Sequence, residues 1–126
     1  MTLENIRIYI ISRLEFNPDK YFSKETLYYL YLKMKKGDIN ISDVYSCLNE
    51  LDCFLYVNNF KADSKEMFGE LLRRNRRQLN ITRLNLLTEK NISFTIINKI
   101  ESGKNCKKNN LENYLKAFPN LKIDIK

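Results

Sequence analysis

Lysine and arginine are the side chains whose number and placement point most clearly to a chemistry. The chain has 126 residues, with 22 Lys or Arg, 15 Asp or Glu and a net charge of +7. Residues 1–62 hold 8 basic and 8 acidic side chains, whereas residues 63–126 hold 14 basic and 7 acidic ones. The entire positive excess lies in the second half, so we expect that half to bind a polyanion. A solubilising surface is the alternative explanation of the same charge.

Side chains suited to catalysis or metal binding are scarce. The sequence has no His, only three Gly, and three widely spaced cysteines at Cys47, Cys53 and Cys106. The commonest general base, a phosphate-cradling glycine loop and a zinc motif are therefore missing from the sequence, and the cysteines fit no disulfide framework. We expect a protein that is not an enzyme and that needs no cofactor or metal.

The composition is that of a folded protein. Hydrophobic residues make up 44% and charged residues 29% of a chain long enough for one compact domain or two very small ones. No apolar run approaches the length of a membrane span, and the first residues lack the pattern of a signal peptide. We therefore expect a cytoplasmic protein without a membrane partner.

The first half predicts three helices and a strand. Apolar spacing favours a helix over residues 2–16, and Ser23 and Ser42 are candidate N-caps of two further helices. Gly37 suits the end of the second helix, and residues 53–57 are typical of a strand. This order fits a small helical module with one or two short strands. This module either resembles a winged helix or is a helical element that serves for support or dimerisation.

The second half predicts more helices and a final strand. Ser64 is a candidate N-cap for a helix that reaches about Leu79, and a last helix ends before Pro119. Residues 121–126 alternate apolar and polar side chains, which predicts a strand that pairs with residues 54–57 within the chain or across a dimer. The polar break near residue 62 divides the chain into predicted modules 1–62 and 63–126.

The segment from Leu79 to Lys104 has a distinctive pattern, LNITRLNLLTEKNISFTIINKIESGK. A cap, a core Leu, a turn residue, a second cap, two apolar anchors and a Glu-x-Gly ending follow one another as Thr82, Leu86, Asn91, Ser93, Ile97, Ile100, Glu101 and Gly103. This pattern resembles the helix-turn-helix of the Cro/C1 family, also called the Xre family.

The resemblance implies a mainly α fold, with a five-helix DNA-binding domain over residues 63–126. It implies that the second motif helix lies in the DNA major groove. Base contacts would come from Phe94, Thr95, Asn98 and Lys99. Phosphate contacts would come from Arg83, Ser93, Ser102, Lys104, Lys107 and Lys108. The family also pairs an Arg of its first helix with the Glu that ends the second motif helix, here Arg76 and Glu101.

The sequence departs from the family pattern at three positions. Arg83 replaces a Gln that contacts phosphate, and Leu87 replaces a small Ala at the helix crossing. Phe94 is apolar where a polar base reader is usual, so it packs on a thymine methyl group or marks a protein-binding surface.

Two functions follow as hypotheses. The first is a sequence-specific repressor or autoregulator of a phage, plasmid or other mobile element, which binds double-stranded DNA as a homodimer because one such module buries little surface. The second is a protein-binding inhibitor or antitoxin-like protein, such as an anti-CRISPR protein, that reuses the same fold. The operator, the regulated gene and the role of the first half are open.

Overall fold

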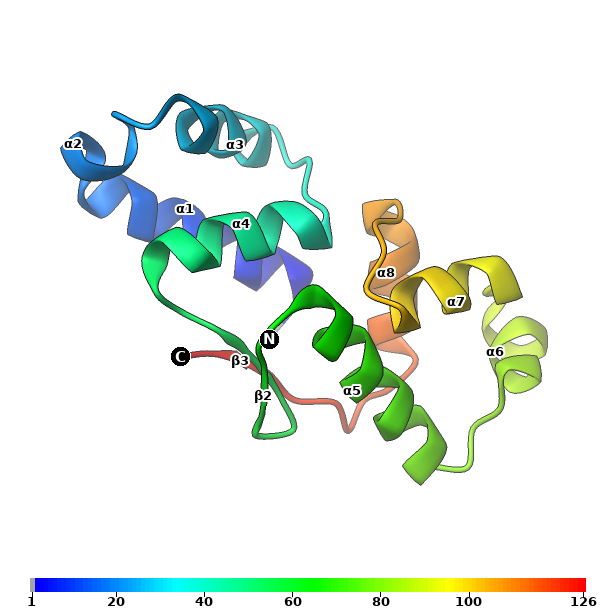
Figure 1. Ribbon diagram of the computed structural model, residues 1–126. Helices are drawn as coiled ribbons and strands as arrows, with labels where there is room; N and C mark the ends of the chain where they lie inside the picture. Colours follow the sequence, from blue (N-terminus) through cyan, green and yellow to red (C-terminus); the bar gives the residue numbers. More distant parts are fainter. Residues whose placement is uncertain (1) are drawn as a thin grey trace.

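The computed structural model describes residues 2–126, so Met1, the first residue of the predicted N-terminal module, lies outside the described residues. Eight helices and a three-stranded antiparallel sheet form in this range (Figure 1), which confirms the mainly α class. In chain order the elements are α1 (Leu3–Phe16), α2 (Pro18–Tyr21), α3 (Glu25–Lys35), α4 (Ile41–Leu51), β1 (Leu55–Val57), β2 (Phe60–Ala62), α5 (Lys65–Gln78), α6 (Arg83–Lys90), α7 (Phe94–Glu101), α8 (Lys108–Lys116) and β3 (Ile123–Ile125).

Helix α1 is the base on which α3 and α4 pack. Its apolar residues recur every three or four positions, so Ile6, Ile10 and Leu14 share one buried face. Met34 of α3 and Val44 of α4 are also fully buried. Each such side chain contributes about 1.5–3 kcal/mol through burial, which holds the three helices together.

The starts of the second and third predicted helices differ from the expectation. The Oγ of Ser23 donates to the carbonyl of Lys20 at 3.1 Å and caps nothing. The cap of α4 is Asn40, whose Oδ1 accepts from the amide of Asp43 at 2.9 Å, and not Ser42. Asn caps a helix as well as Ser does, so residue type alone does not show which of the two caps α4. Gly37 follows α3 with a φ of +85°, as predicted for a helix end.

The three strands form a sheet in the order β2-β1-β3. β1 and β2 make a hairpin whose two turn residues, Asn58 and Asn59, have φ values of +50° and +71°, the geometry of a tight two-residue turn. β3 pairs antiparallel with β1, with Leu55 opposite Ile125. The predicted C-terminal strand is therefore confirmed, and it pairs within the chain.

The sheet links the two predicted modules. The boundary at residue 62 falls between β2 and α5, but β3 returns from the second module to pair with β1 of the first. Beside this pairing, Oδ1 of Asn75 accepts from Nδ2 of both Asn58 and Asn120, each at 3.0 Å. The buried apolar side chains of both modules belong to one continuous core.

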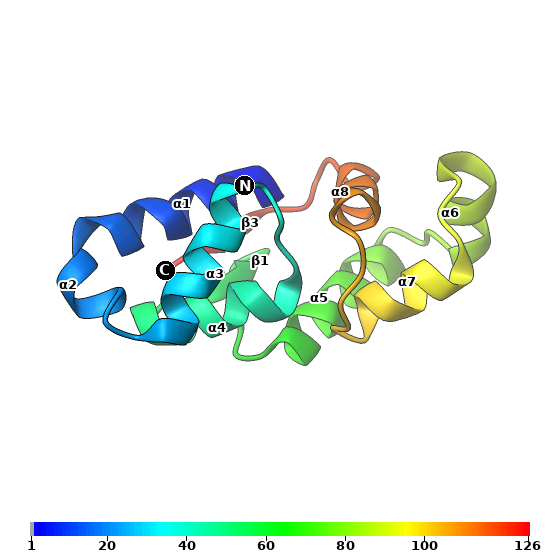
Figure 2. The ribbon, with the colours of Figure 1, turned by 90° about the horizontal axis from the view of Figure 1, so that it is seen from above.

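Residues 63–126 contain four helices, and not the five that the family resemblance implies. The chain after α8 turns at Pro119 and enters β3, so its last residues join the sheet instead of forming another helix. Figure 2 shows α5 and α7 side by side, with α6 at the end of the molecule away from α1.

Two glycines permit the close crossing of α5 and α7. A β-carbon on Gly69 would stand 2.6 Å from the amide nitrogen of Gly103 and 2.7 Å from the carbonyl oxygen of Ile100. A β-carbon on Gly103, whose φ is +74°, would stand 2.3 Å from the carbonyl oxygen of Lys65. Larger residues would push α7 away from the helix that supports it.

Candidate nucleic-acid interface

Local hydrogen bonds define where α6 and α7 begin. The Oγ1 of Thr82 accepts from the amide of Asn85 at 3.1 Å, and Oδ1 of Asn85 accepts from the amide of Thr82 at 2.9 Å, which is a reciprocal cap. The Oγ of Ser93 accepts from the amide of Ile96 at 3.2 Å. Both predicted caps are confirmed.

A three-residue turn joins α6 to α7. Asn91 has a φ of +56° in the left-handed region, which Asn tolerates better than most residues. The next residue, Ile92, is buried and fixes the turn to the core. The amide of Ile92 also donates to the carbonyl of Leu86 at 3.1 Å. The local turn and the burial of Ile92 in the core therefore together set the direction of α7 relative to α6.

Helix α7 has a buried face and an exposed face. Ile97 and Ile100 are buried against the core. The four predicted base-contacting side chains lie together on the opposite, exposed face: Phe94, Thr95, Asn98 and Lys99. The aromatic ring of Phe94 is 46% exposed. The exposed face thus combines hydrogen-bonding groups, one cation and one apolar ring.

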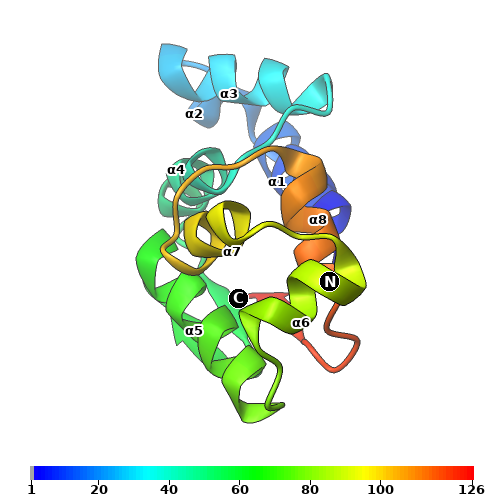
Figure 3. The same ribbon diagram turned by 90° about the vertical axis from the view of Figure 1, so that its right-hand side faces the viewer.

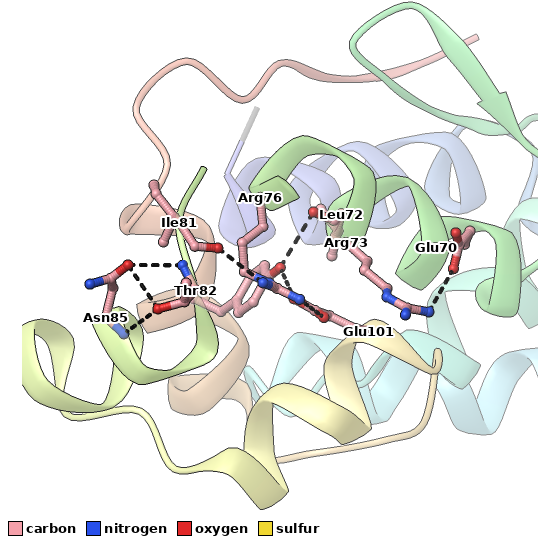
Figure 4. A network of polar contacts seen from close by, with 9 residues as sticks. Glu70, Leu72, Arg73, Arg76, Ile81, Thr82, Asn85 and Glu101 are labelled. Atoms are coloured by element: carbon pink, nitrogen blue, oxygen red, sulfur yellow. Dashed lines mark hydrogen bonds and ion pairs between the residues drawn. The ribbon is translucent and has the colours of Figure 1, made fainter. Parts of the chain in front are cut away.

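A buried ion pair joins α5 to the end of α7 (Figure 4). Nε of Arg76 lies 2.7 Å from Oε2 of Glu101, and Nη2 lies 2.9 Å from Oε1. The side chains are 6% and 5% exposed, so the predicted Arg76–Glu101 pair is confirmed as a two-pronged, buried contact. Nη1 of Arg76 also donates to the carbonyl of Ile81 at 3.0 Å, which ties the chain before α6 to the same group.

Tyr114 of α8 is a third member of this network. Its hydroxyl donates to Oε2 of Glu101 at 2.7 Å. Burial, and then the negative charge of Glu101, raise the pKa of Tyr114, so the phenol stays protonated and remains a donor. The hydrogen bonds that Arg76 donates to Glu101 likewise raise the pKa of Arg76. No local pattern links position 114 to position 101, so this contact could not be predicted from the sequence.

The predicted phosphate-contacting residues do not all share one environment. Five of the six are exposed, namely Arg83, Ser93, Ser102, Lys104 and Lys107. The structure turns Lys108 toward the N-terminal module instead, where its Nζ lies 3.4 Å from the carbonyl of Gly37 and 3.8 Å from Oε2 of Glu4. In the loop between α7 and α8, Oδ1 of Asn105 accepts from the amide of Ser42 at 3.1 Å. The loop after α7 is therefore held against the start of α4.

A further basic surface lies between the end of α5 and the start of α6. An open depression of about 540 Å³ lies there, and Arg77, Asn80 and Arg83 are among the residues that line it. Arg77 is exposed and makes no ion pair with any residue in the range 2–126. Its neighbours Arg73 and Arg74 both lie near Glu70, at 3.7 and 3.5 Å. Arg77 thus adds an uncompensated cation beside the predicted phosphate contact of Arg83.

The acidic side chains and the cysteines of residues 2–126 are the remaining groups that could form a chemical site. No cluster of three or more His, Cys, Asp or Glu side chains there is arranged to hold a metal ion, and no helix is long and apolar enough to cross a membrane. The three cysteines are free, and Cys47 and Cys53 are buried. Burial raises the pKa of the Cys47 thiol to about 12, which keeps it protonated near neutral pH.

Comparison with known proteins adds no relative. A scan against protein-family models, a search of curated proteins and a search of solved structures each found no match to this chain. Any functional reading therefore depends on the residues and the geometry described above.

Proposed function

We propose that residues 63–126 form a helix-turn-helix domain of the Cro/C1 type and that the protein is a small sequence-specific DNA-binding regulator, a repressor or autoregulator that acts as a dimer. The observation that carries the proposal is the exposed face of α7, with Thr95, Asn98 and Lys99 on the side opposite the buried Ile97 and Ile100. A helix of this kind, following a three-residue turn, presents its outer side chains to base edges in the major groove.

The chemistry of that face suits base recognition. The amide of Asn98 matches the paired donor and acceptor of adenine, and the ammonium of Lys99 matches the acceptors of guanine. Arg83, Lys104 and Lys107 flank α7 in exposed positions from which they would contact phosphates. The positive excess of residues 63–126 supplies the long-range attraction that such binding needs.

A binding-site selection from random duplexes, followed by fluorescence anisotropy, tests the proposal. The wild-type chain should enrich a defined sequence, and Lys99→Ala should change the ranking of sites because a base contact is lost. Glu89→Ala is a matched control, since Glu89 is exposed on α6 and has no assigned contact. Failure to enrich any sequence, or an unchanged ranking for Lys99→Ala, would contradict the assignment of α7.

Phe94 favours a second candidate function. An aromatic ring that is 46% exposed at the start of α7 is typical of a protein interface as well as of a thymine contact. The same fold would then serve a protein-binding inhibitor or antitoxin-like protein. A gel shift with the DNA upstream of the gene, paired with a pull-down by wild type and Phe94→Ala, separates the two: loss of a captured protein without loss of the DNA shift favours protein binding.

A further inference from the structure

Helix α3 carries large apolar side chains on its outer face as well as on its inner one. Tyr28, Tyr29 and Leu32 are 43%, 64% and 42% exposed. Single exposed apolar residues are ordinary, but three on adjacent turns of one helix form a stripe. Figure 3 shows α3 at the edge of the molecule, away from α6 and α7. We call the surface formed by this stripe and the charged side chains at its two ends the α3 face; its residues are Glu25, Tyr28, Tyr29, Leu32 and Lys36.

Aromatic contacts hold part of the α3 face in place. The ring of Tyr28 lies 5.3 Å from that of Phe22 and 6.2 Å from that of Tyr31, measured between centroids. The hydroxyl of Tyr31 donates to Oε2 of Glu15 on α1 at 2.5 Å. The ring of Tyr28 is therefore already held in place, which lowers the entropic cost of association at that position.

The two ends of the α3 face carry opposite charges. Glu25 lies in the first turn of α3 and Lys36 directly follows its last residue. Both are exposed, and neither forms an ion pair with another residue in the range 2–126. The helical spacing from Glu25 through Tyr29 and Leu32 to Lys36 places all four on one side of the helix. The face is thus acidic at one end, apolar in the middle and basic at the other end.

We propose that the α3 face packs antiparallel against the α3 face of a second copy of this chain, forming a symmetric homodimer. A two-fold axis beside residues 30 and 31 sets Glu25 opposite Lys36 of the second copy, and Tyr29 opposite Leu32 of the second copy. Each pair occurs twice because the interface is the same patch on both chains. The antiparallel arrangement also opposes the two helix dipoles.

Charge explains why the second copy approaches from this side. Residues 1–62 hold 8 basic and 8 acidic side chains, so two such modules meet without net repulsion. Two copies of residues 63–126, with 14 basic and 7 acidic side chains each, would repel one another. Contact through α3 keeps the exposed face of α7 free in both copies. The role of this dimer in joining two DNA-binding halves rests on the proposed function, but the dimer itself is measured without DNA.

Sedimentation equilibrium of the full chain tests the interface. One helix face buries little area, so we expect a monomer–dimer equilibrium with a micromolar dissociation constant, measured up to about 300 µM. Leu32→Glu and Tyr29→Lys should each raise this constant by about tenfold or more, because a charge replaces a central apolar contact. Leu84→Lys, at a 58% exposed position on α6, is the matched control and should leave it unchanged. Circular dichroism confirms that each variant is folded.

Charge reversal tests the antiparallel register. Glu25→Lys and Lys36→Glu should each weaken the dimer, and the double variant should restore it, because the reversed charges again face each other. Both changes oppose the helix dipole, so recovery in the double variant cannot come from a more stable α3. A chain that stays monomeric at about 300 µM, a dimer insensitive to Leu32→Glu, or a double variant weaker than both single variants overturns the proposal. A monomer that still selects a DNA sequence would refute the dimer alone, and a dimer that selects none would refute the DNA-binding function alone.

Discussion

Gly69 of α5 and Gly103 after α7 meet with no room for a side chain between them: a β-carbon on Gly69 would lie 2.6 Å from the amide nitrogen of Gly103. The atoms that it would meet are backbone atoms, which cannot rotate away as a flexible side chain does. The contact therefore fixes how close α7 lies to α5, and with it the position of the exposed face of α7.

Gly69→Ala should destabilise the fold by about 1–3 kcal/mol or more, because the added methyl group overpacks two backbones. Gly37→Ala is the matched control. A β-carbon there has nothing within 4 Å, so its cost comes only from the φ of +85° and should be about 1 kcal/mol. Urea unfolding of both variants measures the difference. Equal losses would show that α5 and α7 do not cross as closely as described.

The buried Arg76–Glu101 pair should respond differently to single and double substitution. Arg76→Leu leaves the carboxylate of Glu101 buried with only the Tyr114 hydroxyl as a partner, which should cost about 3–5 kcal/mol. Arg76→Leu with Glu101→Leu removes both charges and should recover part of that loss. Arg74→Leu, which removes an exposed arginine near Glu70, should cost less than about 1 kcal/mol. Denaturant unfolding of the three variants makes the comparison, and a double variant no more stable than Arg76→Leu would contradict it.

Local sequence signals were sufficient for much of the fold and for the candidate site. The caps Ser64, Thr82 and Ser93 and the left-handed Asn91 act within a few residues of themselves, so their roles follow from nearby sequence. The Arg76–Glu101 pair followed from a family pattern. The caps and the turn depend on neighbouring residues, and the ion pair depends on a spacing that is known from the family.

Contacts between distant segments were not predictable in the same way. The orientation of Lys108 toward Glu4, the hydroxyl of Tyr114 on Glu101 and the crossing at Gly69 all depend on how separate helices meet. The cap of α4 was predicted at Ser42 instead of Asn40 for a different reason. Ser and Asn cap helices equally well and lie two positions apart here, so residue type did not distinguish them. Tertiary packing thus decided the first three points, and the choice of cap was a local one.

Stability should fall at alkaline pH. Burial raises the pKa of the Cys47 thiol from 9.0 to about 12, and burial also raises the pKa of Tyr45. A raised folded-state pKa means that these groups ionise first in the unfolded chain. The contribution of Cys47 is therefore present below about pH 9 and is lost as pH rises toward 12, whereas that of Tyr45 is lost only above its ordinary pKa of 10.0. Each group lowers the unfolding free energy by up to about 1.4 kcal/mol per pH unit in that window. Urea unfolding between about pH 8 and pH 11 tests this, and Cys47→Ala should give a shallower slope than wild type. Identical slopes would show that the thiol does not contribute.

Salt dependence should separate the three lysines that follow α7. Each phosphate contact releases condensed counterions, so Lys104→Ala and Lys107→Ala should each reduce the slope of log affinity against log salt by about 1 and weaken all DNA sites alike. Lys108→Ala should change the slope less, because its Nζ lies 3.8 Å from Glu4 and 3.4 Å from the carbonyl of Gly37. Fluorescence anisotropy with one selected duplex, repeated over a series of salt concentrations, provides the slopes. An effect of Lys108→Ala as large as that of Lys107→Ala would mean that Lys108 leaves Glu4 and joins the phosphate contacts when DNA binds.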